Sequence, residues 1–227
     1  MRMFLDRQAA GRALGERLAG LGIAGNVLVL GLPRGGIPVA CEVAAALGAP
    51  VDALVVRKLG APFNPELALG AIAFGGATVY NEDLLAQLDL DEQDLEPIHT
   101  RELAELARRE RAYRAGRAPL AVTGATVIIV DDGMATGATM HAAVVATRAL
   151  DPARIVVAVP TAACDAVERL EGVADEVVAL ATPEPYFGVG AWYARFPQVT
   201  DEEVIAALAA AAKPRAAAPR SGGRDAA

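Results

Sequence analysis

The 227-residue sequence predicts a single-domain α/β fold in which helices cover both faces of a parallel β-sheet. Short runs rich in β-branched apolar residues alternate with helix-compatible segments along most of the chain. These runs lack polar alternation, which is typical of strands buried on both faces. The hydrophobic content of 54% is sufficient for one substantial core.

The predicted elements follow one another in βα order. The strands are expected at residues 26–30, 51–56, 127–130, 154–159 and 176–180. The helices are expected at 5–20, about 36–47, about 140–150, 163–170 and from 200 onward. The first helix places Ala10, Leu14 and Leu18 at helical spacing. Thr200 and Glu203 form a capping box at the start of the last helix.

Two segments interrupt the alternation. Residues 67–74 and 77–80 are expected to pair as a hairpin about Gly75-Gly76, and 82–117 form polar helices with acids early and arginines late. Residues 182–197 contain five aromatic residues among glycines and prolines, and they predict an irregular flap. We therefore expect one domain over residues 1–212, followed by a disordered tail at 213–227.

Composition limits the possible partners. A formal charge of -7 and a pI near 4.9 argue against general binding to nucleic acid or to an anionic membrane. Cys41 and Cys164 are typical of reduced core residues in a cytoplasmic protein. The sequence shows neither an apolar run long enough to cross a membrane nor the apolar region of a signal peptide.

The most specific motif is the stretch from Val127 to Met140, VIIVDDGMATGATM. A buried strand ends there in two adjacent carboxylates, Asp131 and Asp132, and a small-residue turn at 136–139 then begins a helix. A helix N-terminus binds phosphate through its unpaired N–H groups and the positive end of its dipole. The two threonines of the turn add hydroxyl donors, and its glycine lets the backbone approach the ligand closely.

Carboxylates beside a phosphate site fit a sugar phosphate, because acids accept hydrogen bonds from vicinal ribose hydroxyls and attract a divalent cation. In an open α/β sheet, ligands bind beyond the carboxyl ends of the strands. Two further stretches are expected at that edge, the glycine-rich turn Gly31–Gly36 and the basic pair Arg57-Lys58. With Asp131–Thr139 they offer two backbone anion sites, a basic pair and an acid pair.

The stretch Val127–Thr139 resembles the phosphoribosyl pyrophosphate (PRPP) signature of the type I phosphoribosyltransferases, an apolar strand followed by two acids and a Thr-Gly-x-Thr loop. The resemblance extends over about residues 4–208 to stand-alone phosphoribosyltransferase-domain proteins that carry GLPRGG, RKLG and DDG-x-ATG. It implies a type I phosphoribosyltransferase-like fold with a small hood, while the acceptor stays undefined.

The resemblance also implies a role for each motif. Asp131 and Asp132 would contact the ribose 2- and 3-hydroxyls of PRPP. The loop that would hold the 5-phosphate consists of Ala135, Thr136, Gly137, Ala138 and Thr139. The residues that would hold pyrophosphate are Pro33, Arg34, Gly35, Gly36, Arg57 and Lys58. Arg34 and Lys58 are the candidate catalytic residues, although they could instead be a surface arginine and a lysine that extends from a strand end to solvent.

The implied reaction is transfer of the 5-phosphoribosyl group from PRPP to a nitrogenous base or amine, with release of pyrophosphate, as in nucleotide metabolism. Mg²⁺ would be the cofactor, with most of its ligands from PRPP and water near Asp131 and Asp132. Water must be excluded, so a lid is expected at either 182–197 or 82–117.

Three aromatic residues of the flap are candidates for the acceptor site. Tyr186, Phe187 and Trp192 could stack on a planar base. Alternatively, they could plug the edge of the sheet or form a subunit contact in a homo-oligomer. Ala135 stands where 6-oxopurine members carry an acid, which disfavours hypoxanthine and guanine and leaves adenine-, orotate- and uracil-type acceptors open.

Two other classes of protein stay open at this point. The same scaffold could serve a non-catalytic regulator that binds PRPP or a nucleotide. A hydrolase with an aspartate nucleophile fits less well, because a Thr-Gly-x-Thr loop suits binding better than nucleophilic attack. His99 and His141 are the only histidines, and His141 lies on the predicted helix after the phosphate loop, where a helix-surface role is expected.

Overall fold

The computed structural model describes residues 4–73, 76–114 and 116–212, so the tail predicted at 213–227 lies outside the described residues. A five-stranded parallel sheet has the order β2-β1-β6-β7-β8. Its strands are β1 (Val27–Gly31), β2 (Val51–Ala53), β6 (Thr126–Val130), β7 (Arg154–Thr161) and β8 (Glu176–Ala181). From β1 the chain continues to β2 on one side, whereas β6, β7 and β8 follow on the other side. The order of the strands therefore reverses between β1 and β6, and sheets of this class bind ligands at the carboxyl ends of the strands at such a switch point.

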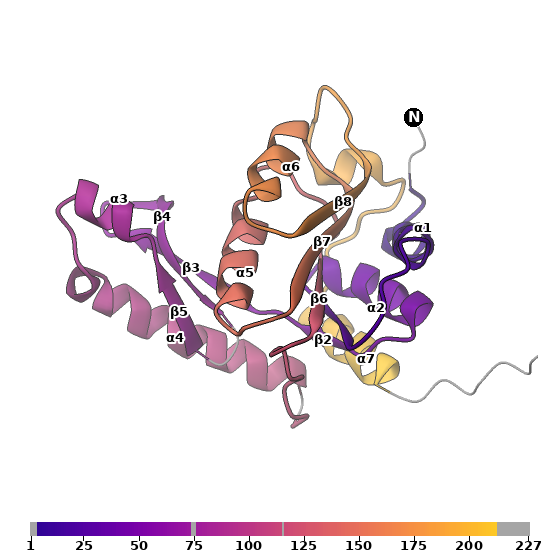
Figure 1. Cartoon of the computed structure of the whole chain (residues 1–227), viewed down its shortest axis with the longest axis horizontal. Helices are drawn as coiled ribbons and strands as arrows, with labels where there is room; N and C mark the ends of the chain where they lie inside the picture. The colour runs from indigo at the N-terminus through magenta and orange to yellow at the C-terminus, as the bar shows by residue number, and fades with distance from the viewer. Residues whose placement is uncertain (1–3, 74–75, 115, 213–227) are drawn as a thin grey trace, which may run out of the picture.

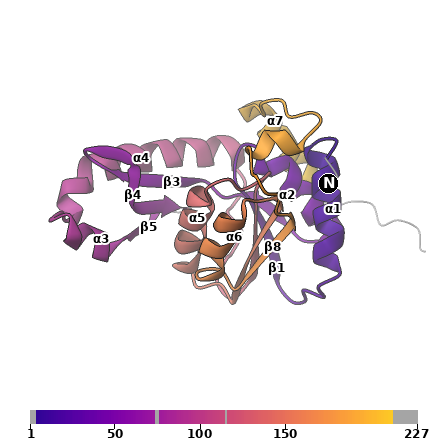
Figure 2. The same ribbon diagram turned by 90° about the horizontal axis from the view of Figure 1, so that it is seen from above.

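Helices cover both faces of this sheet, which confirms the predicted fold class (Figures 1 and 2). One face carries α1 (Arg7–Ala19), α2 (Gly36–Leu47) and α7 (Asp201–Ala211), and the other carries α5 (Ala138–Arg148) and α6 (Cys164–Glu171). Along β6, Ile128 and Val130 join the apolar cluster under α1, α2 and α7, whereas Val127 and Ile129 join the cluster under α5 and α6. Within the described residues, no helix combines the length and the apolar character needed to cross a bilayer.

A second sheet forms an arm that extends from the main sheet (Figure 1). It consists of the antiparallel strands β3 (Val56–Ala61), β4 (Asn64–Ala73) and β5 (Ala77–Tyr80), followed by α3 (Glu82–Gln87) and α4 (Glu92–Arg114). The predicted hairpin and the polar helices after it are therefore confirmed, apart from residues 74 and 75 at the turn, which lie outside the described residues.

The predicted strand at 51–56 is wrong in one respect. Its parallel pairing with β1 ends at Ala53, because β1 itself ends at Gly31 and the last backbone bond runs from Leu54 N to Gly31 O (2.9 Å). The apolar run continues as β3, which pairs with β4 in the arm. Arg57 and Lys58 consequently lie inside an antiparallel strand and not at the carboxyl end of a parallel one.

The N-terminal segment pairs with the aromatic segment that precedes α7. Phe4 N donates to Trp192 O and Ala194 N donates to Phe4 O, both at 2.8 Å. A short 3₁₀ helix, η2 (Val189–Trp192), lies in this otherwise irregular segment. The capping box predicted for α7 is present, with the Thr200 and Glu203 side chains each accepting from the other's backbone N–H.

Candidate functional site

The acid pair and the glycine-rich turn meet at the switch point of the main sheet. β1 and β6 are parallel neighbours, with Gly31 beside Val130, so Leu32 and Asp131 leave the same edge together. Leu32 N donates to Val130 O at 2.8 Å, which extends the pairing one residue beyond β1. Residues 31–36 and 131–139, which the sequence predicted on one edge, are therefore brought together.

Two glycines allow the turn to approach the acid pair. A Cβ atom added to Gly35 would lie 2.1 Å from Asp132 Oδ2, and one added to Gly36 would lie 2.7 Å from Val130 O and 2.9 Å from Asp131 Cα. Real Cβ atoms do not make such contacts, so any larger residue at either position would have to displace part of the acid pair or its backbone. The Pro33-Arg34 peptide bond in the same turn is cis. The backbone that would face pyrophosphate lies directly against the carboxylates that would face ribose.

The two carboxylates have different surroundings. Asp131 Oδ1 accepts a hydrogen bond from Asp132 N at 2.8 Å. Burial, and secondarily the charge of Asp132, raises the pKa of Asp131 well above its usual range. Asp132 instead forms an ion pair with Arg7, whose Nε lies 2.8 Å from Oδ2. The pair therefore combines a partly buried acid of raised pKa with a neighbour that has a cationic partner.

Arg7 connects the acid pair to the aromatic segment, and the sequence did not identify it as a site residue. Its Nη1 donates to Pro197 O at 2.7 Å, and its guanidinium carbon lies 3.8 Å from the centroid of the Phe196 ring. Tyr193 Oη donates to the backbone carbonyl of Asp132, and burial raises the pKa of Tyr193. No local pattern could reveal the pairing, because 125 residues separate Arg7 from Asp132.

The proposed phosphate loop presents donors at the start of α5. Gly137 is the N-cap with φ 75°, a left-handed conformation that glycine adopts without strain. Thr136, Ala138 and Thr139 are exposed, so the first turn of α5 is accessible to an anion. Arg169 on α6 fixes the loop from outside by donating to Thr136 O at 2.9 Å.

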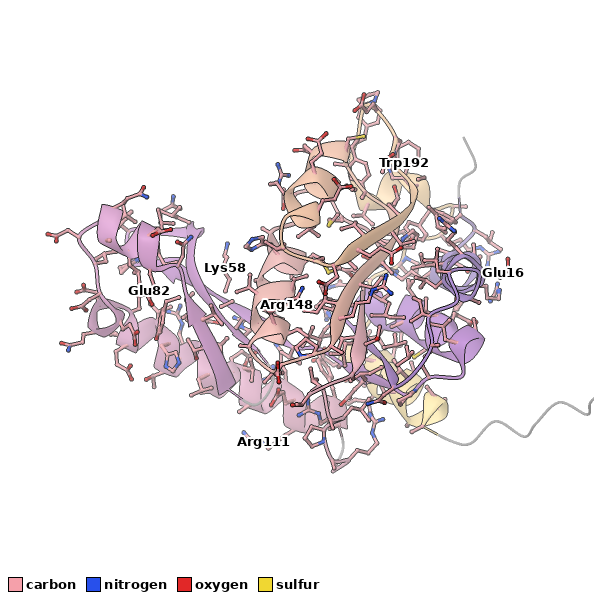
Figure 3. All side chains as sticks on the ribbon, viewed as in Figure 1. Glu16, Lys58, Glu82, Arg111, Arg148 and Trp192 are labelled. Atoms are coloured by element: carbon pink, nitrogen blue, oxygen red, sulfur yellow. The ribbon has the colours of Figure 1, made fainter. Side chains whose placement is uncertain are left out.

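The three predicted basic residues, Arg34, Arg57 and Lys58, lie in different surroundings. Arg34 Nη1 lies 4.0 Å from Asp201 Oδ1 at the start of α7, and 40% of the Arg34 side chain is exposed. Arg57 Nε donates to Glu102 Oε2 at 2.6 Å, which places this guanidinium against α4 instead of the edge of the main sheet. Lys58 points to the opposite face of β3, because successive strand residues alternate. Figure 3 shows Lys58 extending on the side of the arm that faces α5.

The three aromatic candidates, Tyr186, Phe187 and Trp192, do not form a single cluster. Tyr186 and Trp192 stack on each other, with ring centroids 6.2 Å apart and an interplanar angle of 28°. Within the described part of the chain, Tyr186 Oη and Trp192 Nε1 are buried without a hydrogen-bond partner. Phe187 is 79% exposed and makes no ring contact with them. In Figure 3, α5 and α6 lie between Trp192 and Lys58.

Comparison with known proteins agrees with this geometry. The model of the family described as "Phosphoribosyl transferase domain" matches residues 6–191. Two Mycobacterium tuberculosis proteins, from strains CDC 1551 and H37Rv, are each named "Putative phosphoribosyl transferase", and each is 50% identical over 208 residues. These residues are 92% of this chain but 47% of each relative, so the chain spans about half the length of these relatives.

A crystal structure of TT1426 from Thermus thermophilus is similar over nearly its whole length. It is 48% identical, has a TM-score of 0.85, and is matched over 92% of this chain and 98% of its own. The family match covers the central motif, both glycine-containing loops and the arm. The chain belongs to the phosphoribosyl transferase domain family.

Proposed function

We propose that this protein transfers the 5-phosphoribosyl group from PRPP to a nitrogenous base or amine and releases pyrophosphate. One observation carries the proposal: the acid pair lies in contact with the glycine-rich turn and immediately precedes the helix N-terminus of α5. PRPP has a phosphate, a ribose diol and a pyrophosphate in the matching order. We place the reaction in the cytoplasm, which is consistent with the unpaired Cys41 and Cys164.

Each part of PRPP has a proposed partner. The 5-phosphate binds the backbone donors and hydroxyls of residues 135–139, where the dipole of α5 favours an anion. The ribose hydroxyls donate to Asp131 and Asp132. The pyrophosphate binds the backbone of residues 33–36, which glycine allows to lie close to the acid pair.

Departure of pyrophosphate leaves an oxocarbenium-like ribose, so the protein acts mainly by positioning and by stabilising charge. Arg34 is exposed on the turn and can rotate from Asp201 toward the leaving group. Lys58 is proposed to approach from the arm, and Arg57, which is paired with Glu102, is proposed to have a mainly structural role. Arg34 and Lys58 therefore remain the proposed catalytic cations.

Magnesium fits this site as a partner of the substrate. Within residues 4–73, 76–114 and 116–212, no group of three or more acidic, histidine or cysteine side chains could hold a metal. Asp131 and Asp132 provide carboxylates beside the ribose, and Mg²⁺ prefers phosphate oxygens and waters for most of its shell. When bound, the ion would neutralise charge on the pyrophosphate.

The first test is calorimetric titration of the protein with PRPP and Mg²⁺, followed by measurement of pyrophosphate release with a panel of bases. Binding with base-dependent release is the expected result, and it would identify the acceptor. Binding without release for any base would favour a PRPP-sensing regulator on the same fold. Absence of PRPP binding would contradict both functions.

The acceptor site is proposed at Tyr186, Phe187 and Trp192. Replacing Trp192 by Ala should raise the KM for the acceptor about 10-fold, because stacking on an aromatic ring contributes about 1 kcal/mol or more. The affinity for PRPP should change much less. Phe63→Ala is the matched control, since this exposed aromatic residue lies in the β3–β4 turn of the arm. Equal losses for both substrates in Trp192→Ala would indicate a purely structural role.

A further inference from the structure

We propose that Arg7 is a positioning residue for PRPP binding, which acts by holding Asp132 in the orientation that the ribose requires. The inference rests on the proposed function and adds a residue from the first helix to the site. Arg7 contacts two separate parts of the chain: Asp132 after β6, and the segment before α7, through the Pro197 carbonyl and the Phe196 ring. Only 9% of its side chain is exposed.

The position of Arg7 on its helix is not explained by helix stability. Asp6 is the N-cap of α1 and accepts from Ala9 N at 2.9 Å, which places Arg7 in the first turn. A positive charge there opposes the helix dipole, and burial of a guanidinium is costly unless it is paired. Both costs are offset by the bond to Asp132, so the contact, and not the helix, accounts for an arginine at this position.

The ion pair also determines which oxygen of Asp132 can meet a substrate. Oδ2 accepts from Arg7 Nε and lies against Gly35, where even a methyl group would approach it to 2.1 Å. The ion pair does not use Oδ1, which lies farther from the same glycine, at 3.2 Å from an added Cβ atom. Arg7 thus holds Oδ2, and Oδ1 is the oxygen that would accept a ribose hydroxyl.

The charge of Arg7 matters for the acid pair as a whole. Burial and the adjacent charge of Asp132 both raise the pKa of Asp131. Arg7 lowers the pKa of Asp131 against this effect, and Tyr186 and Tyr193 are further titratable groups near the pair in the described part of the chain. Arg7 therefore favours the ionised form of Asp131, which accepts hydrogen bonds from a diol.

Chemical rescue can separate this role from a structural one. Arg7 also lines a cavity of about 990 Å³ between α1, α2 and α7, which gives a small cation a route to the vacated position. Arg7→Ala should lower PRPP affinity at least about 10-fold, since truncating one partner of a buried charge pair is expensive. Millimolar guanidinium chloride should restore a several-fold part of that affinity, whereas equal sodium chloride should not.

Two further variants complete the experiment. Arg12→Ala is the matched control, because Arg12 lies on the same helix in a looser pair with Glu42 (3.6 Å) and is 58% exposed. It should bind PRPP like the wild type and show no response to guanidinium. Arg7→Lys keeps the charge but loses the forked geometry, so its affinity should lie between those of the wild type and Arg7→Ala. If Arg7→Ala fails to fold, the PRPP affinity of Arg7→Lys still tests the proposed role of Arg7.

The outcomes distinguish this inference from the proposed function. Wild-type affinity in a folded Arg7→Ala or in Arg7→Lys would overturn the role of Arg7 alone. An affinity loss in Arg7→Ala that guanidinium does not relieve would also overturn it, because a general structural defect would behave in this way. If the wild-type protein does not bind PRPP, the proposed function fails, and the role of Arg7 fails with it.

Discussion

Replacing both Asp131 and Asp132 by Asn should lower the affinity for PRPP at least about 100-fold, because two charge-assisted hydrogen bonds to the ribose are lost. The size of the side chains is nearly unchanged, so the fold should persist. Calorimetric titration with PRPP and Mg²⁺ measures the effect. Asp83→Asn is the matched control, because this aspartate is exposed and lies in the first turn of α3, in the arm.

The single variant Asp131→Asn should also change stability in a pH-dependent way. The folded-state pKa of Asp131 is raised above the usual value of 3.8, so the folded protein binds this proton more tightly than the unfolded chain does. The wild type therefore loses stability as pH rises from about 4 through the raised pKa. Asn removes this loss, so at neutral pH the variant should be more stable than the wild type.

Thermal unfolding as a function of pH checks this expectation. The melting temperatures of Asp131→Asn and wild type should converge near pH 4 and separate above it, in favour of the variant. For the binding prediction, wild-type PRPP affinity in a folded variant with both Asp131 and Asp132 replaced by Asn would show that the acid pair does not bind PRPP. A variant that is less stable at neutral pH would show that the hydrogen bond to Asp132 N outweighs the cost of burying the charge.

Replacing Gly35 by Ala should produce the second large effect on binding. The added Cβ would lie 2.1 Å from Asp132 Oδ2, and Arg7 holds that oxygen from the other side. The carboxylate and the turn must therefore separate. We expect PRPP affinity to fall about 10- to 100-fold and the free energy of unfolding to fall by about 1–3 kcal/mol.

Gly172→Ala provides the control for Gly35→Ala. Gly172 has φ -83°, and a Cβ atom there would meet nothing within 4 Å. Its replacement should leave both PRPP affinity and unfolding unchanged. If Gly35→Ala bound PRPP like the wild type, the contact between the turn and the acid pair would not matter for binding.

Several features could be predicted because their causes are local. The helix at 5–20, the strand at 127–130 and the capping box of Thr200 each depend on residues a few positions apart, and the structure confirms them. The carboxyl ends of parallel neighbours share one edge, so the meeting of residues 31–36 with 131–139 was predictable as well. The roles assigned to their side chains stay predictions.

The predicted position of the basic pair Arg57-Lys58 at the edge of the main sheet was wrong, because it depends on contacts between distant residues. Residues 51–58 were predicted as one apolar strand, 51–56, followed by a basic pair, yet the parallel pairing stops at Ala53 because β1 offers no further partner. The chain then enters a different sheet, and Arg57 meets Glu102, 45 residues away. No pattern within the segment indicates which strand it will pair with.

The sequence by itself determined the fold class, the order of the elements and the family-like motifs, because hydrophobic periodicity and loop chemistry depend on residues that are close together in the sequence. Only the tertiary structure decided which charges meet. It paired Arg7 with Asp132, turned Arg57 to α4, and stacked Tyr186 on Trp192. The physical reason is that an ion pair or a ring contact depends on distance in space. The fold brings together residues that are far apart in the sequence, and no local pattern indicates that they will be in contact.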